Sequence, residues 1–293
     1  DTQSYAELLY ISGGGNSSYG GDSPSESKLS NSSVSFSGVL PASGSDGLRI
    51  GLGHLSSGAR ASVKLKATND DPEYTASVKH DMTSTGIMVA LPVQQNFGVA
   101  VSLVAAQESQ NISIESADIP AENISYNVAT FSSDYRRGDT QMVLSCSAGA
   151  NSRDDILESD IEPSLTIGAT WMRPGINYMA ALTAHEYSKI DTNFEDKASY
   201  LIGVERQFGQ SKRFVLTYEY EPAYYKNPDG LGAASIGGST LAGSLTVRLQ
   251  EQIDAGFAST YSPRSTGSVT KDGVNYKASV DATSLGFILR KMF

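Results

Sequence analysis

A histidine and a serine early in the chain have the spacing of a reacting pair. His54 and Ser56 lie two residues apart in the segment Gly-Leu-Gly-His-Leu-Ser-Ser-Gly, residues 51–58. In an extended strand, side chains two residues apart point to the same side. A histidine beside a serine can take the hydroxyl proton and prepare the oxygen to attack an ester. The spacing is therefore compatible with ester hydrolysis.

This pair resembles the His-x-Ser motif of outer-membrane phospholipase A and of the lipid A deacylases, which act on lipid esters at the surface of a barrel. Asparagine usually follows the serine in those enzymes, whereas Ser57 follows it here. Asn69 is the available candidate for an orienting amide. A barrel-surface lipid hydrolase that uses His54 and Ser56 is kept as an alternative. The main interpretation assigns no catalytic residue and no enzymatic activity.

The other reactive residue types do not form a recognisable centre. Cys146 is the single cysteine, so an internal disulfide and a multi-cysteine metal site are excluded. His80 and His185 are isolated in the sequence, and no metal-ligand spacing links them. A formal net charge of −10 argues against nucleic-acid binding, which requires a basic surface. We expect no cofactor and no metal.

The last ten residues have the pattern of a strand with one apolar face. Leu285, Phe287, Leu289 and Phe293 fall on one side of an extended strand. This ending resembles the closing strand of Gram-negative outer-membrane β-barrel proteins, which typically ends in phenylalanine, although Lys291 departs from the pattern. The resemblance implies a lipid-facing row and recognition by the barrel assembly machinery through the strand that ends at Phe293.

Short turn-like segments recur about every forty residues and divide the chain into hairpins. They lie at residues 41–47, 92–96, 136–140, 173–175, 209–212 and 250–252. The flanking segments alternate, as Leu165, Ile167 and Trp171 do before one turn. Longer polar connections are expected at residues 13–31, 69–72, 109–122, 151–160, 189–196, 221–238 and 263–273. Short turns at one end and long loops at the other are typical of outer-membrane barrels.

These units predict an all-β fold in which residues 1–293 form one transmembrane antiparallel up-and-down β-barrel. We expect about fourteen strands, with twelve to sixteen as the range. Residues 48–91 form either one long hairpin that extends past the membrane or, in the sixteen-strand alternative, an extra hairpin. A seven-bladed propeller would also consist of seven units of about forty residues, but each blade would need four short strands. No apolar run approaches the roughly 18 residues of a membrane helix.

The face opposite the apolar rows carries charged and amide side chains that we expect to line a pore. These residues are Arg49, Glu205, Gln207, Glu219, Arg248, Asp254 and Arg290. Mixed charges at a similar depth would form a polar ring that orients and filters solutes. The competing interpretation is that the same groups pair across strands and hold the barrel in shape.

The sequence thus predicts a passive pore or transport channel for small solutes in the bacterial outer membrane, as a mature chain after signal-peptide removal. Expected partners are outer-membrane lipid, lipopolysaccharide and small solutes, and the oligomeric state stays open. A structural or adhesive barrel with functional extracellular loops is a further alternative. Outer-membrane transporters of long-chain fatty acids and hydrocarbons have a similar strand number. We find neither their plug segment nor their Asn-Pro-Ala motif, so this resemblance is architectural.

Overall fold

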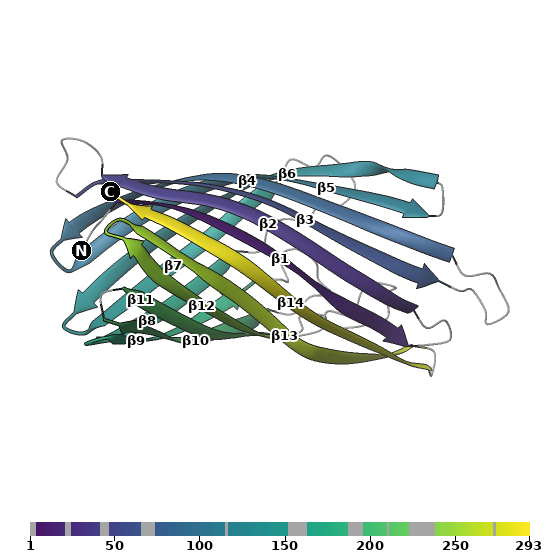
Figure 1. Ribbon diagram of the computed structural model, residues 1–293. Coiled ribbons are helices and arrows are strands. Elements are labelled where there is room, and N and C mark those ends of the chain that lie inside the picture. Colours follow the sequence, from purple (N-terminus) through teal and green to yellow (C-terminus); the bar gives the residue numbers. More distant parts are fainter. Residues whose placement is uncertain are drawn as a thin grey trace.

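The described residues form a single closed sheet. The computed structural model describes residues 4–20, 25–41, 47–65, 74–114, 117–151, 163–186, 196–209, 211–222, 238–271 and 274–293. These residues form 14 strands, each antiparallel to its neighbours in the chain, and β14 pairs with β1 to close the barrel (Figure 1). The predicted fold class is confirmed. The propeller and the extra hairpin of the sixteen-strand alternative are wrong, because one sheet of 14 strands closes on itself.

The strand bounds follow the chain in order. They are β1 Tyr5–Gly20, β2 Ser25–Pro41, β3 Arg49–Leu65, β4 Tyr74–Gln94, β5 Phe97–Ile114, β6 Ala117–Arg137, β7 Thr140–Asn151, β8 Ser164–Arg173, β9 Ile176–His185, β10 Lys197–Phe208, β11 Lys212–Glu221, β12 Gly238–Gln250, β13 Ile253–Lys271 and β14 Val274–Met292. In the described part of the chain, no helix has the length and apolar character needed to cross a membrane.

The described short connections lie at five of the predicted turns and gather at the end of the barrel where β1 begins and β14 ends (Figure 1). Most of the turn predicted at residues 41–47 lies outside the described residues. Gly138 and Gly175 have φ values of 58° and 77°, a left-handed conformation that glycine adopts without steric cost. Each of the five described turns also accepts a backbone hydrogen bond from the next hairpin. The Gly175 carbonyl accepts a hydrogen bond from the Gln207 N–H at 2.9 Å, and the Asn96 carbonyl accepts one from the Arg136 N–H at 2.8 Å. These bonds make this rim continuous.

Strand length divides the wall into a long part and a short part. β13, β14 and β1–β6 are neighbours in the closed sheet and contain 16 to 21 residues each. β7–β12 contain 10 to 13. Because about 9–11 tilted residues cross a bilayer, the long strands extend well beyond that thickness. The long hairpin predicted within residues 48–91 is confirmed as β3 and β4.

The expected positions of the polar connections are partly wrong. At residues 13–31, 109–122 and 263–273, most of the described residues belong to β1, β2, β5, β6 and β13. The expected connections at residues 69–72, 151–160, 189–196 and 221–238 lie wholly or largely outside the described residues.

Large apolar side chains point outward and form a belt around the barrel. Leu52, Phe257 and Leu285 are 55%, 71% and 68% exposed, and Phe287, Leu289 and Phe293 are exposed beside them as the sequence predicts. Trp171 and Tyr178 face each other across β8 and β9 with ring centroids 5.8 Å apart. An apolar surface of this continuity is stable against the hydrocarbon core of a bilayer, with aromatic rings at its edges.

Among the described residues, no large side chain is fully buried, and Ala76 and Ala106 are the buried hydrophobic residues. A water-soluble domain of this size would bury a packed apolar core. Many of the large apolar side chains of this chain lie on the outside instead. The functional question therefore concerns the interior face.

Candidate functional site: the interior wall of the barrel

Charged side chains of four neighbouring strands meet on the interior face near the short turns. Arg248 of β12 lies opposite Asp254 of β13, and its Nε donates a hydrogen bond to Oδ1 at 3.0 Å. Asp254 lies opposite Arg290 of β14, which lies opposite Glu7 of β1. Arg290 Nε donates to Glu7 Oε2 at 2.8 Å. We call these four residues the charge ladder. Opposite charges on facing residues stabilise neighbouring strands.

A further ion pair lies beside the ladder. Arg213 Nη2 donates to Glu205 Oε2 at 2.6 Å, and Gln207 lies opposite Arg213 on β11. The structure therefore brings Glu205 and Gln207 together around Arg213. Each of these pairs joins one positive and one negative group, the arrangement expected where charges hold neighbouring strands together.

Two of the expected pore-lining residues lie apart from these pairs. Arg49 begins β3 and faces Ala90 of β4, in another part of the wall. Glu219 lies opposite Leu201, toward the end of β11 that is remote from the short turn.

Hydroxyl groups pair across other interior positions. His185 Nε2 lies 3.0 Å from Ser199 Oγ on the neighbouring strand. The remaining pairs are Ser147–Ser164, Thr166–Thr183, Thr240–Ser262 and Thr260–Ser284, with oxygen–oxygen distances of 2.5 to 2.9 Å. Such groups are stable beside water, as the alternation in the sequence indicates.

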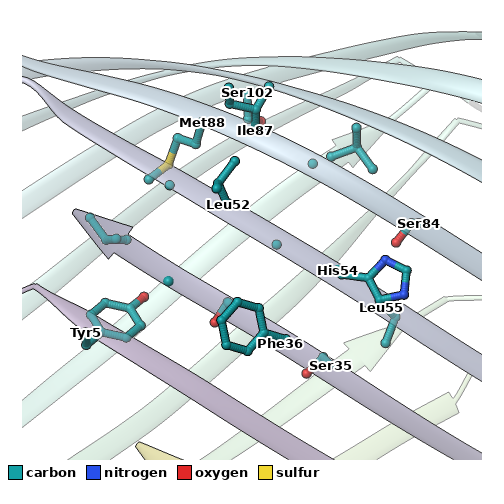
Figure 2. Close-up of a pocket in the computed structure, with 17 residues that line it drawn as sticks. Tyr5, Ser35, Phe36, Leu52, His54, Leu55, Ser84, Ile87, Met88 and Ser102 are labelled. Atoms are coloured by element: carbon teal, nitrogen blue, oxygen red, sulfur yellow. The ribbon is translucent and has the colours of Figure 1, made fainter. Parts of the chain in front are cut away.

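A hollow of about 360 Å³ lies in the wall formed by β1–β5, and Figure 2 shows its lining side chains. Gly53 and Gly86 face each other across β3 and β4, beside Gly51. Most of the lining residues have interior parity; they include Tyr5, Val39, Leu55, Met88 and Val104 with Ser35, Ser37, Ser84 and Ser102. We call this the glycine-floored pocket. It is mainly apolar, with a few hydroxyl groups.

Glycine is what makes room for this pocket. A Cβ atom at Gly86 would come within 3.0 Å of Val104 Cγ2, and one at Gly51 within 3.0 Å of Met88 Cε. At Gly53 the nearest atom would be 3.9 Å away. Side chains at these positions would fill the space that the pocket occupies. The volume is in the range of small-molecule sites.

A second polar cluster lies on β4–β6, farther from the short turns than the pocket. His80 Nε2 and Glu108 Oε1 form a hydrogen-bonded ion pair between β4 and β5. The Tyr126 hydroxyl of β6 donates to Met82 Sδ at 3.2 Å. Between these two strands lies Ala106 of β5, opposite Tyr126 and 4% exposed. Imidazole, carboxylate, thioether and phenol groups therefore converge on the interior face.

His54 and Ser56 take a different position. Both are exposed on the outward face, on the phase of Ile50 and Leu52. His54 Nδ1 lies 3.0 Å from Thr85 Oγ1, so its recorded side-chain partner is a threonine on β4. Asn69 lies outside the described residues.

Sequence reasoning missed several members of the interior wall. Glu7 and Arg213 are the partners of two expected residues, and His80, which is isolated in the sequence, pairs with Glu108 in the fold. Strand parity places Glu7 opposite in phase to Leu8, which would have indicated an interior carboxylate. The glycines of the pocket had no signal, because glycine in a strand has several structural uses.

No protein-family profile and no curated protein matches the sequence. Solved barrels do match the fold. A FadL homologue from Pseudomonas aeruginosa has a TM-score of 0.70 and 10% identity, and the match covers 99% of this chain and 90% of that chain.

The deltaS2S3 mutant of the TodX monoaromatic hydrocarbon channel has a TM-score of 0.77 and 9% identity over 100% of this chain and 91% of that one. The Pseudomonas putida toluene transporter TodX has a TM-score of 0.68 and 9% identity over 98% and 89%. At such identities the likeness shows a shared barrel fold.

Proposed function

We propose that this chain is an outer-membrane β-barrel channel that passes small, mainly hydrophobic solutes without a cofactor or covalent chemistry. The observation that carries the proposal is the glycine-floored pocket, an apolar hollow in the interior wall of a closed barrel. A hollow of about 360 Å³ fits one small ring or a short alkyl chain. Weak, mainly apolar contacts suit a passive channel, since a solute must leave as readily as it enters.

The structural neighbours support this solute class. Two of them are named as a monoaromatic hydrocarbon channel and a toluene transporter, and both share the barrel fold with this chain over nearly its whole length. Their names give a reason to test aromatic hydrocarbons first. The apolar lining of Val39, Leu55, Met88 and Val104 gives an independent one.

The apolar belt on the outer surface of the barrel supports a location in the outer membrane. The belt would face outer-membrane lipid, with the short turns in the periplasm and the ends of the long strands outside the cell. Lipopolysaccharide would then contact the outer face of the long strands. The barrel assembly machinery would recognise β14 and Phe293, as in barrels with the same ending.

The charged and amide side chains of the interior face are proposed to line the channel. We infer that Arg49, Glu205, Gln207, Glu219, Arg248, Asp254 and Arg290 line an aqueous path beside the pocket. Because three arginines of this wall are paired with carboxylates, their first effect is to hold the strands in register. Their second effect is a local field on passing ions.

Filling the pocket tests the proposal. Gly53→Phe places a ring where a Cβ atom meets nothing closer than 3.9 Å, so the barrel should still fold. Toluene uptake into vesicles that contain the purified protein should slow by about tenfold or more, because the ring occupies the apolar hollow. Gly243→Phe is the control, since Gly243 lies on the lipid-facing phase of β12 between Leu241 and Leu245.

Wild-type uptake no faster than in empty vesicles would overturn the proposal and favour a structural or adhesive barrel. Equal uptake by the two phenylalanine variants would remove the pocket from the solute path.

A further inference from the structure

We propose that His80 and Glu108 select the polar head of an amphiphilic solute, accepting a neutral hydrogen-bond donor such as an alcohol and rejecting a carboxylate. This inference rests on the proposed function and names the solute more closely. It starts from the position of a hydrogen-bonded histidine and carboxylate on β4 and β5, two of the strands that line the glycine-floored pocket.

Register places the pair next to the glycine-floored pocket, on the side of the pocket that is farther from the short turns. The interior positions of β4 run from His80 through Met82 and Ser84 to Gly86, which is part of the pocket. On β5 they run from Glu108 through Ala106 to Val104, which also lines it. Four strand residues span about 13 Å. One molecule of roughly octyl length would therefore reach from Glu108, where its head group binds, to the pocket, where its tail binds.

The surface between the two sites is suited to an alkyl tail. Ser84 and Ala106 face each other across β4 and β5 with small side chains. Leu55 lies opposite Ser84 on one side, and Tyr126 lies opposite Ala106 on the other. The Tyr126–Met82 hydrogen bond holds an aromatic ring and a thioether over Ala106. A flexible thioether adapts readily to an apolar ligand.

Charge decides which head group the pair accepts. Glu108 uses one carboxylate oxygen toward His80, and its side chain is 32% exposed. The second oxygen can accept a hydrogen bond from a solute hydroxyl or amine. Whether the imidazole is neutral or protonated, the pair as a whole carries a negative or zero charge. It therefore offers no net positive charge to balance a carboxylate head, whereas the second Glu108 oxygen can bind a neutral donor.

The cations of this wall are remote from the pair. On the interior phase of the described parts of β3–β6, the arginines are Arg49 and Arg136, and both lie beside the short turns. Lys79 and Arg60 belong to the outward phase, where Lys79 is paired with Asp81. The interior surface around Glu108 thus favours a donor over an anion.

The test compares two solutes with the same tail. Calorimetric titration of 1-octanol and of octanoate into the protein in phosphatidylcholine nanodiscs, corrected with empty discs, measures the preference. We expect wild type to bind octanol at least about tenfold more tightly than octanoate, since like charges brought together in a partly dry site are unfavourable. In Glu108→Gln the ratio should fall to about threefold or less, because the amide keeps the shape and loses the charge.

Asp81→Asn is the matched control, since it removes a carboxylate from the neighbouring strand β4, next to His80 but on the outward face. It should keep the wild-type ratio. Equal binding of both solutes by wild type, or an unchanged ratio in Glu108→Gln, would overturn the selection by Glu108 and leave the channel proposal standing. Absence of octanol binding together with absence of toluene uptake would overturn both proposals.

Discussion

Arg290 joins the charged and the apolar parts of the interior wall. Its guanidinium pairs with Glu7 and also lies 5.3 Å from the centre of the Tyr5 ring. Tyr5 in turn lines the glycine-floored pocket. One arginine therefore belongs to the charge ladder and contacts a residue that lines the pocket, so that its replacement is expected to affect ions and apolar solutes differently.

Charge reversal in the ladder should change ion selectivity. In Arg248→Glu and in Arg290→Glu, the reversal potential in a salt gradient should shift toward cations, more strongly at low ionic strength where screening is weak. The measurement is a planar-bilayer recording. The double variant Glu7→Arg/Arg290→Glu restores one opposite-charge pair and should return most of the shift.

Leu245→Glu is the control for these recordings, because Leu245 is exposed on the outer face and its replacement should impair folding rather than selectivity. If both arginine variants conducted with wild-type reversal potentials, the ladder would lie outside the ion path.

The sequence predicted these residues but not their partners. Alternation alone places Arg248, Asp254 and Arg290 on the interior face, since parity needs only the local strand. Pairing needs the register between strands. His80 and Glu108 are 28 residues apart in the sequence, and they meet because the register of β4 and β5 pairs His80 with Gln110 and Met82 with Glu108.

The long strands show where strand prediction failed and why. β1 and β2 continue through a stretch rich in glycine, serine and asparagine, residues that are common in turns and weak in strands. There the outward face meets water, so the apolar alternation that marks a strand is lost. The short strands β8 and β9 keep that alternation along their whole length, and they were predicted correctly.

Two neighbouring residues of β10 should lose very different amounts of folding free energy on the same substitution. Ile202→Arg puts a charge into the middle of the apolar belt, where Ile202 is 53% exposed, and should cost about 2–4 kcal/mol of folding free energy. Leu201→Arg points inward, opposite Glu219, and should cost much less. Urea titration in phospholipid vesicles measures both.

Equal losses in the two β10 variants would mean that the two faces of this strand meet the same surroundings. The assignment of an outer and an inner face would then be wrong.

In the part of the chain that the structure describes, the barrel wall is uneven in height, because eight long strands stand beside six short ones (Figure 1). The extra eight or so residues per long strand add roughly 20 Å of wall along the barrel axis. His80 and Glu108 belong to this taller part. In the proposed orientation a solute would meet the tall wall before it reaches the level of the bilayer.

The complete molecule should require an amphiphilic solvent. The outward apolar belt predicts aggregation in plain buffer and solubility in detergent or lipid. On a gel, the unheated protein should migrate as a compact form and shift after boiling, because the closed sheet has no free edge at which to unravel. A monodisperse monomer in buffer without detergent would contradict the membrane assignment.

The pairing of β1 with β14 joins residues from opposite ends of the chain, as Tyr5 with Met292. The entropy lost in bringing two segments together grows with the logarithm of the chain between them, so this seam costs about 4 kcal/mol more to close than a hairpin turn. It is therefore expected to form last, and until then both edge strands can capture other chains. The barrel closes only when β1 pairs with β14. A chaperone that shields these two edge strands would therefore prevent aggregation during the last step of folding.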